Sequence, residues 1–558
     1  MTSVEQALEA EATKEELRVD IDLRPEIAEH AGDELRELLL AYVRELVDSL
    51  GIPAEPVVAL ASSPDAADRP DPYTIRVGGR ACAPRLPLDV AADAPAEDLI
   101  EAIAGSITAN RELLLTPTIA DRLAREWNAR SPLVARVGLT PDAFTGLLVD
   151  LLRRCVSVAP RALGPPERYD EVGEPRIDSL DGLREAILDA GSAPSITIFV
   201  EPRLLAAPAE NSSSSGDYDL SVLGSTLQEL FVEELGLLLP AIQSAADPGL
   251  PAGRFRIQVN DLRFAPVRGL LAGEVLVPTS VEDLEGRGLT ARAATNPTQG
   301  GEAAVVGADE SVVAALKAHG YFTVSARGYV AFAARRALRG LAGSFLRSDL
   351  LMFQLNRLRD DDPVVVDAAL ERFDHRLLTA VFRRLLDEQV PIRNAVAVLE
   401  GMLAIGPGVS IDQSLYEVVA PEAASMWSVP DGSGLDHPGA SEYVECVRRH
   451  LRWALTRSTA DDGNQIQALR VDRRLESRIR RPSEPLDDDE RERLRNAVWA
   501  VYERFARTGS GIVVVTNSEV RHELKRLLEP TFPELQVLSR HEIAPGAELR
   551  WKDEIAWA

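Results

Sequence analysis

Two stretches of the chain repeat the same order of apolar and polar residues. Residues 17–23 (LRVDIDL) alternate with the period of a β-strand, and residues 34–51 have the spacing of an amphipathic helix that ends at a glycine. Another strand pattern follows at residues 73–78. The same order returns at residues 195–200, 225–236 and 255–260. Each stretch is therefore predicted to form a strand–helix–strand unit, with Tyr73 opposite Phe255.

The similarity continues into a predicted helix in each copy. Apolar residues from Leu377 to Leu386 lie on one helix face, and the segment Val390-Pro-Ile392 comes after them. The same spacing occurs 234 residues earlier, so that Cys155 aligns with Gln389. Helical spacing is common on its own. The similar segment after the helix in each copy, together with the two strand–helix–strand units before it, predicts an internal duplication.

The two copies differ in length and in the segments at their C-terminal ends. Between the second strand and the next helix, the first copy has about 20 residues and the second about 65, which predicts an inserted subdomain in the second copy. A C-terminal block, residues 465–558, has no counterpart in the first copy. Its strand pattern at 511–515, helix at 518–528 and strand at 535–538 predict an α/β unit.

The predicted fold class is thus mixed α/β (α+β) and multidomain, with an internal duplication, small α+β subdomains, a helical subdomain and a C-terminal α/β subdomain. The predicted segments are an N-terminal tail (1–15), a reduced first copy (16–193), the α+β core of the second copy (194–275 and 326–345), the inserted subdomain (276–325), the helical subdomain (346–430) and the C-terminal α/β subdomain (431–558).

Composition narrows the classes of function. The net charge of −27 argues against a general nucleic-acid or anionic-membrane binder, because phosphates would be repelled over most of the surface. Solubility explains this charge, and a docking surface for basic partners is the alternative. There is no run of about 18 apolar residues, so we expect a cytoplasmic chain without a membrane-spanning helix.

Motifs for catalysis and metal binding are missing from the sequence. There is no GxxxxGK[ST], HExxH or GxSxG pattern, and the three cysteines and seven histidines lack metal-ligand spacing. Residues 487–490 (DDDE) are predicted to cap a helix, since they lack the spacing of a calcium loop. The basic run 470–481 is either a solvated, salt-bridged helix face or a docking patch for an acidic partner. We therefore expect no enzyme activity, no metal and no cofactor.

Three segments carry a resemblance to a known family. Residues 516–543 contain Arg521 at a helix start, then Val537-Leu-Ser539 and Glu542-Ile543. Residues 469–476 match the entry to the same domain, with Arg473 in place of a proline, and residues 385–400 match a helical junction, with Asn394 in place of an aspartate. From about residue 194 onward the chain resembles the cytoplasmic domain of the type III export-gate (FHIPEP) family.

This resemblance implies a non-enzymatic docking platform that binds chaperone, cargo or export-apparatus proteins, and implies a possible homo-oligomer at the inner face of the membrane. The sequence departs from the family in lacking its membrane half and in having Gln299 and Val305 where the inserted subdomain has aromatic residues. The expected partner-contact residues are Val305, Tyr321, Tyr329 and Phe332, because aromatic and aliphatic side chains dominate protein-binding hot spots. The alternative is a soluble scaffold or regulator unrelated to secretion.

Overall fold

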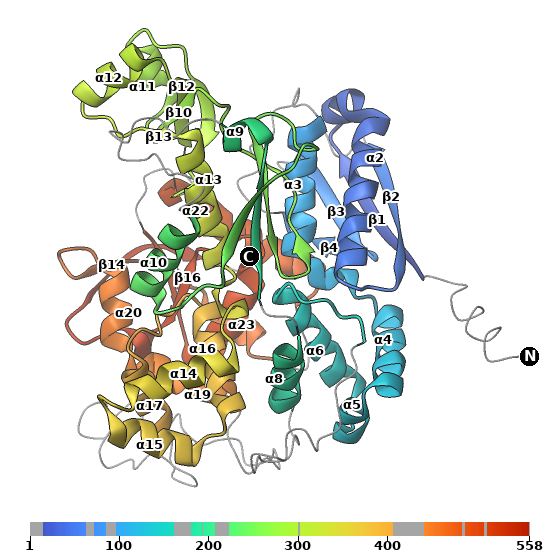
Figure 1. Ribbon diagram of the computed structural model, residues 1–558, viewed down its shortest axis with the longest axis vertical. Helices are drawn as coiled ribbons and strands as arrows, with labels where there is room; N and C mark the ends of the chain where they lie inside the picture. The colour runs from blue at the N-terminus through green and yellow to red at the C-terminus, as the bar shows by residue number, and fades with distance from the viewer. Residues whose placement is uncertain are drawn as a thin grey trace, which may run out of the picture.

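The computed structural model (Figure 1) describes residues 15–62, 72–84, 96–160, 180–191, 194–206, 223–298, 302–404, 440–481, 486–506 and 511–556. Strands of these residues form four small sheets among many helices, which confirms the predicted mixed α+β, multidomain fold class. The predicted tail, apart from Glu15, and Gln299 lie outside the described residues.

The sheets of the two copies have the same topology. The first copy consists of β1 (Glu15–Leu23), α2 (Pro25–Ser49), β2 (Ala54–Ser62), β3 (Tyr73–Val77) and β4 (Arg80–Cys82), in the sheet order β2-β1-β3-β4. The second copy has β5 (Ile196–Val200), α9 (Pro202–Ala206), α10 (Leu223–Leu235), β6 (Ile242–Ala246), β7 (Arg254–Val259) and β8 (Leu262–Arg263), in the order β6-β5-β7-β8, and β9 (Val267–Arg268) also pairs with β7. In each copy the first strand is parallel to the second and antiparallel to the third. Tyr73 pairs with Leu23, and Phe255 pairs with the corresponding Val200. The predicted duplication is confirmed, whereas β2 and β6 were not predicted.

Matching helices come after the two sheets. Those of the first copy are α3 (Ala96–Ala109), η2 (Arg111–Leu114), α4 (Pro117–Arg130), α5 (Pro132–Val137) and α6 (Pro141–Arg153). Those of the second are α13 (Ala326–Arg339), η3 (Ala342–Ser344), α14 (Ser348–Leu358), α15 (Pro363–Arg372) and α16 (His375–Asp387). The remaining helices of this region are α8 (Leu180–Ala190) and α17 (Ala395–Leu403). Even the caps agree, because Thr140 caps α6 and Asp374 caps α16 through side-chain oxygens that accept backbone N–H bonds.

The chain leaves α6 and α16 in the same way. Cys155 and Gln389, aligned in the sequence, have φ angles of 58° and 59°. Three residues later, Val158 N donates to Leu50 O and Ile392 N donates to Leu235 O, both at 2.8 Å. These hydrogen bonds hold the segment after α6 against the C-terminal end of α2, and the segment after α16 against the C-terminal end of α10. The duplication thus extends to the contact between sheet unit and helical unit.

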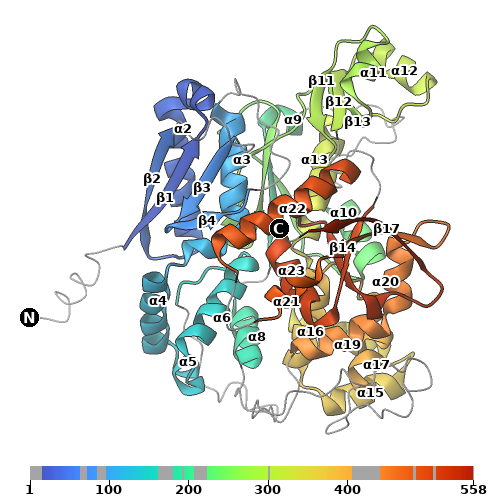
Figure 2. The same ribbon diagram turned by 180° about the vertical axis from the view of Figure 1, so that it is seen from behind.

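The inserted region forms a separate antiparallel sheet. Its elements are β10 (Glu274–Val277), α11 (Val281–Glu285), β11 (Arg292–Thr295), β12 (Glu302–Gly307), α12 (Glu310–Ala318) and β13 (Val324–Ser325), with the strand order β11-β12-β10-β13. The strands are joined to the body of the molecule by α13, as Figure 2 shows from behind.

The C-terminal unit is a parallel sheet with helices. It contains α19 (Ala440–His450), α20 (Arg452–Thr459), β14 (Gln465–Val471), α21 (Arg473–Ile479), α22 (Asp488–Ala506), β15 (Val513–Thr516), α23 (Ser518–Leu528), β16 (Gln536–Ser539), η5 (Arg540–Glu542) and β17 (Glu548–Ile555), in the order β16-β15-β14-β17. The predicted β15–α23–β16 unit is confirmed, and Asp487 caps α22 by accepting from Glu490 N at 2.8 Å. The strands β14 and β17 were not predicted.

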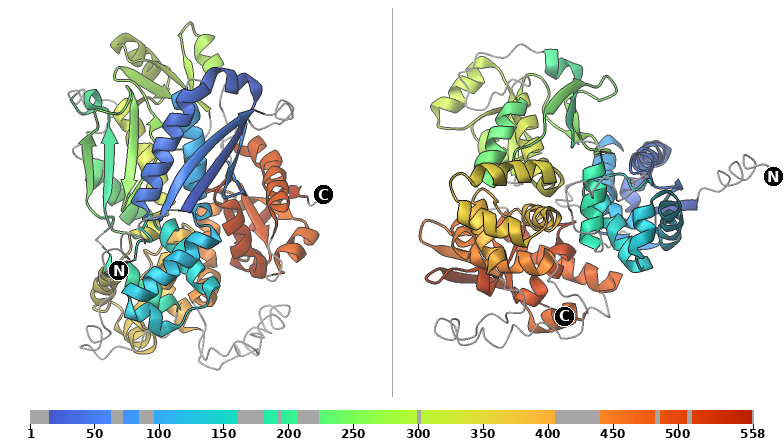
Figure 3. Two further views of the ribbon diagram at one scale, coloured as in Figure 1. Left: turned by 90° about the vertical axis from the view of Figure 1, so that its right-hand side faces the viewer. Right: turned by 60° about the horizontal axis from the view of Figure 1, so that its bottom comes forward.

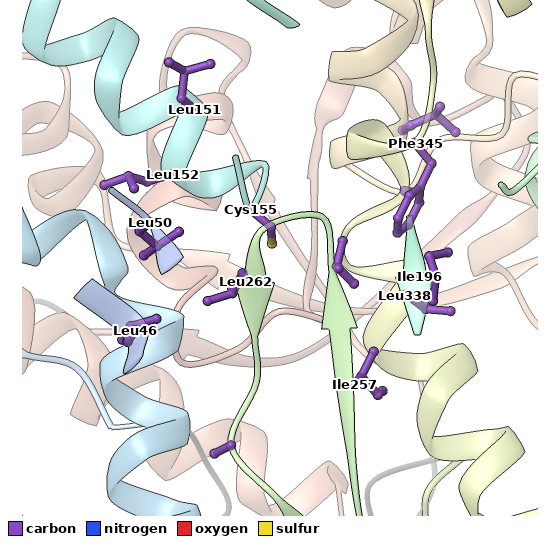
Figure 4. Close-up of a cluster of buried hydrophobic side chains, with 14 of the residues drawn as sticks. Leu46, Leu50, Leu151, Leu152, Cys155, Ile196, Ile257, Leu262, Leu338 and Phe345 are labelled. Atoms are coloured by element: carbon purple, nitrogen blue, oxygen red, sulfur yellow. The ribbon is translucent and has the colours of Figure 1, made fainter. Parts of the chain in front are cut away.

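The first copy packs against the sheet of the second through its helices. Figure 3 shows the two units side by side, and α2 and α3 contact β8 and β9. Figure 4 shows Leu262 of β8 pointing toward Leu46 and Leu50 of α2. Around this apolar contact, Arg254 pairs with Asp98 at 2.5 Å and with Glu101 at 3.1 Å. The buried residues of both copies accordingly form one continuous core.

Among the described residues, no helix is both long enough and apolar enough to cross a membrane.

Candidate protein-docking site

The inserted sheet has two apolar faces with different neighbours. On one face, Val275, Val277 and Val306 form a small core with residues of α11 and α12. The alternate residues, including Leu276 and Val305, belong to the main core of the molecule. This arrangement results from the period-two geometry of strands, which sends neighbouring side chains to opposite faces. The inserted unit is therefore attached to the body by an apolar contact.

Two of the four expected contact residues are part of that core. Val305 is buried on β12, and Tyr329 is buried on α13, where its ring packs edge-on against Phe255 with centroids 6.4 Å apart. Burial raises the pKa of Tyr329 to about 12. These two side chains hold the inserted unit to the body and are not part of an exposed face.

The other two residues are half-buried, Phe332 against the main core and Tyr321 against the small core of the inserted unit. Phe332 lies one turn after Tyr329 on α13 and packs partly against the main core. Tyr321 follows α12, and its hydroxyl donates to a carboxylate oxygen of Asp283 on α11. This hydrogen bond raises the pKa of Tyr321. The Arg287 guanidinium lies 5.2 Å from the centroid of the same ring.

Two exposed apolar side chains in the connections of the inserted region were not predicted from the sequence. Phe322 directly follows Tyr321 and is 41% exposed, and Leu271, in the connection that leads into β10, is 46% exposed. Gly320, with a φ of 83°, turns the chain just before this aromatic pair. A glycine followed by two aromatic residues at a predicted connection was the available signal. Tyr321, Phe322, Leu271 and Phe332 together are called the junction residues below.

Two hollows of the described structure lie away from the junction residues. One, of ≈ 20 Å³, lies between the helical and C-terminal units. The other, of ≈ 400 Å³, is lined by Asp189, Arg347 and His375, among others. The expected partner-contact residues line neither of these two hollows, and their role in binding stays a prediction.

A buried charge network joins the helical unit to the C-terminal unit. Arg521, at the start of α23, is fully buried and pairs with Glu388 at 2.5 Å. Arg448 on α19 pairs with Glu388 at 2.9 Å and with Glu542 at 2.8 Å. Arg521 also pairs with Glu445 on α19. Every charge of this network has a partner, which is what burial of charged groups requires. Arg521, singled out by the family pattern, thereby fixes the orientation of two subdomains.

Chemically reactive groups are few in the described part of the chain. No group of three or more His, Cys, Asp or Glu residues there could hold a metal ion. Burial raises the pKa values of the thiols of Cys82 and Cys155, which disfavours their nucleophilic thiolate forms. The basic run 470–481 contains salt-bridged positions, since Arg478 pairs with Glu490 at 2.7 Å and Arg480 with Glu519 at 2.8 Å.

These features define the class of the protein as a multidomain α+β protein built on a duplicated unit. Residues 180–422 and 436–548 match the FHIPEP family, and the chain belongs to that family. The match begins at α8, which the predicted segments assign to the first copy. Residues before 180 lie outside the match. The boundaries of the predicted segments stay a prediction.

Two curated relatives are similar to this chain in sequence. It is 26% identical over 373 residues to the hypersensitivity response secretion protein HrcV of Ralstonia nicotianae, a match that covers 65% of this chain and 48% of that protein. It is 22% identical over 335 residues to the flagellar biosynthesis protein FlhA of Proteus mirabilis, covering 58% of this chain and 43% of that protein. The chain therefore spans about half the length of these relatives, or less.

Solved structures show the same fold. The CdsV protein of Chlamydia pneumoniae superposes with a TM-score of 0.53 at 17% identity, covering 65% of this chain and 98% of that one. A structure of the complex of CdsV and CdsO from the same organism gives a TM-score of 0.52 at 17% identity, covering 66% of this chain and 99% of that one.

Proposed function

We propose that this chain is a non-enzymatic docking platform of a type III protein export apparatus, which binds chaperone, cargo or export-apparatus proteins on the cytoplasmic side of the membrane. Membership of the FHIPEP family supports the link to export. CdsV, which has the same fold, has been solved in complex with another protein, CdsO. That complex supports protein binding as the use of the fold.

The observation that carries the docking proposal is the exposure of apolar side chains where the inserted unit joins the body. Phe322 and Leu271 are large apolar residues in contact with water, Tyr321 is half-buried directly before Phe322, and Phe332 is half-buried on α13. Burying such side chains against a partner contributes roughly 1.5–3 kcal/mol for each one that becomes fully buried.

The proposed site is tested by pull-down from native cells with the tagged full chain. Phe322→Asp and Phe332→Asp place a charge where an apolar contact is proposed, so both should lose the partners that the unmodified chain retains. Phe353→Asp is the matched control, because Phe353 is 59% exposed on α14 in the helical unit. Thermal unfolding of all variants separates loss of binding from loss of fold, particularly for the half-buried Phe332. Unchanged partners for a folded Phe322→Asp variant would refute the site.

A soluble scaffold or regulator unrelated to secretion is the second candidate. It is favoured by the part of the first copy before α8, which lies outside the family match and contacts the sheet of the second copy. Partner identity decides between the two: export-apparatus, chaperone or cargo proteins support the first proposal, and a different set supports the second. Light scattering of the purified chain tests the proposed homo-oligomer.

A further inference from the structure

An exposed tryptophan marks a second surface, distant in sequence from the inserted unit. Trp453 on α20 is 60% exposed, although Leu455 and Thr456 of the same helix are buried. The hydroxyl oxygen of Thr456 accepts from Ala544 N at 2.7 Å, which ties α20 to the segment after η5. Figures 1 and 2 both show α20 at the periphery of the molecule. A fixed helix therefore holds a large aromatic ring in water.

The side chains around this ring are basic. Leu455 N donates to Leu451 O at 3.0 Å, so the helical path continues from α19 into α20. Residues four positions apart share a helix face, which places Arg457 of α20 on the side of Trp453. Arg449 lies near the end of α19, just before the turn at Leu451 that leads into α20. Arg457 is exposed, and neither it nor Arg452 forms an ion pair with any described residue.

A further basic group comes from η5, also in the C-terminal unit. The turn η5 packs against both α19 and α20 and supplies Arg540, which is exposed and likewise has no ion-pair partner within the described ranges. Burial lowers the pKa of His541, and the charges of Arg449 and Arg540 lower it further. The carboxylate of Glu400 on α17 pairs with His450 of α19 at 3.4 Å. A concentration of positive charge thus lies on a chain whose net charge is −27.

We propose that Trp453 and Arg457, with Arg452 on the same helix and Arg449 and Arg540 on the adjoining α19 and η5, form a docking surface for an acidic segment of a partner protein that also carries apolar side chains. Tryptophan and arginine are the residue types most enriched where binding energy concentrates. Charge complementarity selects the acidic partner. A nucleic acid is disfavoured, because its regularly spaced phosphates would extend onto the strongly acidic remainder of the surface.

The proposal is tested by fluorescence anisotropy with the full chain and a labelled peptide of repeated Glu-Glu-Leu. We expect binding that weakens as salt rises. Trp453→Ala and Arg457→Glu should each weaken binding by about tenfold or more. Phe353→Ala is the matched control. It removes another exposed aromatic ring, which lies beside Arg357 on α14 rather than on α20. Because all three side chains are exposed, the variants should keep the unfolding temperature of the parent.

Three results would overturn the proposal. Equal affinity of the peptide for parent, Trp453→Ala and Arg457→Glu would show that it binds elsewhere, and no binding to the parent would exclude acidic segments. Tighter binding of a labelled single-stranded oligonucleotide than of the peptide, lost in the same variants, would assign the surface to nucleic acid. Concentration-dependent dimerisation that Trp453→Ala abolishes would make the occupant a second copy of this chain. The junction variants Phe322→Asp and Phe332→Asp should retain peptide binding, so the two proposed surfaces fail independently.

Discussion

Two glycines provide a stringent test of the duplicated junction between sheet and helical units. Gly51 and Gly236 end α2 and α10 with φ angles of 67° and 74°. A Cβ on Gly51 would lie 2.4 Å from Ser157 Oγ and 2.8 Å from Ala159 N, and one on Gly236 would lie 2.4 Å from both Cα and N of Arg393. Because the backbone itself is the obstacle, both substitutions by alanine should force the chain apart at this junction.

The magnitude has two parts. A left-handed conformation costs a non-glycine residue roughly 1–2 kcal/mol. Forcing an atom into a packed site adds roughly 1–3 kcal/mol. Gly51→Ala and Gly236→Ala should therefore each lower the free energy of unfolding by about 2–5 kcal/mol. The larger effect is expected for Gly236, because the atoms nearest to its added Cβ are backbone atoms of Arg393. The atom nearest to the added Cβ of Gly51 is the Ser157 hydroxyl oxygen, which can rotate away.

Urea unfolding followed by circular dichroism measures the effect against two controls. Gly138 has a φ of 62° with no atom within 4 Å of its added Cβ, so Gly138→Ala should cost only the conformational part, about 1–2 kcal/mol. Gly105 lies in α3 and also has open space, so Gly105→Ala should stabilise by about 0.5–1 kcal/mol. If Gly236→Ala cost no more than Gly138→Ala, the close approach between the two units would be refuted.

Two further predictions concern the buried charge network. Arg521→Met leaves Glu388 and Glu445 without one of their buried partners, and we expect it to lower the free energy of unfolding by about 3–5 kcal/mol in a urea titration. Arg457→Met, at an exposed position, should change it little. Equal effects would contradict the assigned burial. Burial opposes ionisation of Glu388, but Arg521 and Arg448 outweigh it and hold its pKa well below the usual 4.5. The stability from this carboxylate is therefore present above pH 4.5 and is lost as the pH falls toward its folded-state pKa, and Glu388→Gln should remove that part of the pH dependence. An unchanged acid-unfolding profile in Glu388→Gln would contradict this role.

The strands predicted from the sequence are those in which apolar and polar residues alternate regularly. β1, β3, β5 and β7 each have one buried face, so their side chains follow the period of the pleat. The missed strands β2 and β6 are edge strands of their sheets, and β2 contains Pro56 and mostly small residues, while β6 reads IQSAA. At an edge, backbone pairing with one neighbour decides the structure, and side-chain pattern gives little sign of it.

The candidate site shows a different limit of sequence reasoning. Residue type favoured Val305 and Tyr329 as contact residues, but aromatic and aliphatic side chains supply cores as readily as binding surfaces. Their burial is set by α13 packing against the inserted sheet, a contact between elements distant along the chain. Exposed Phe322 and Trp453 were missed for the same reason, since exposure depends on tertiary neighbours. The partners of Arg521 were equally hidden, because Glu388 lies 133 positions away.

Photo-cross-linking in native cells is a direct test of docking at the junction residues. A photoreactive phenylalanine analogue at position 322 keeps the apolar character of the exposed side chain and reacts only with what touches it. We predict cross-links from this position to chaperone, cargo or export-apparatus proteins, and none of these from the same analogue at position 353, on the helical unit. The same cross-linked proteins from both positions, or none from position 322, would contradict the claim that the junction residues form the docking site.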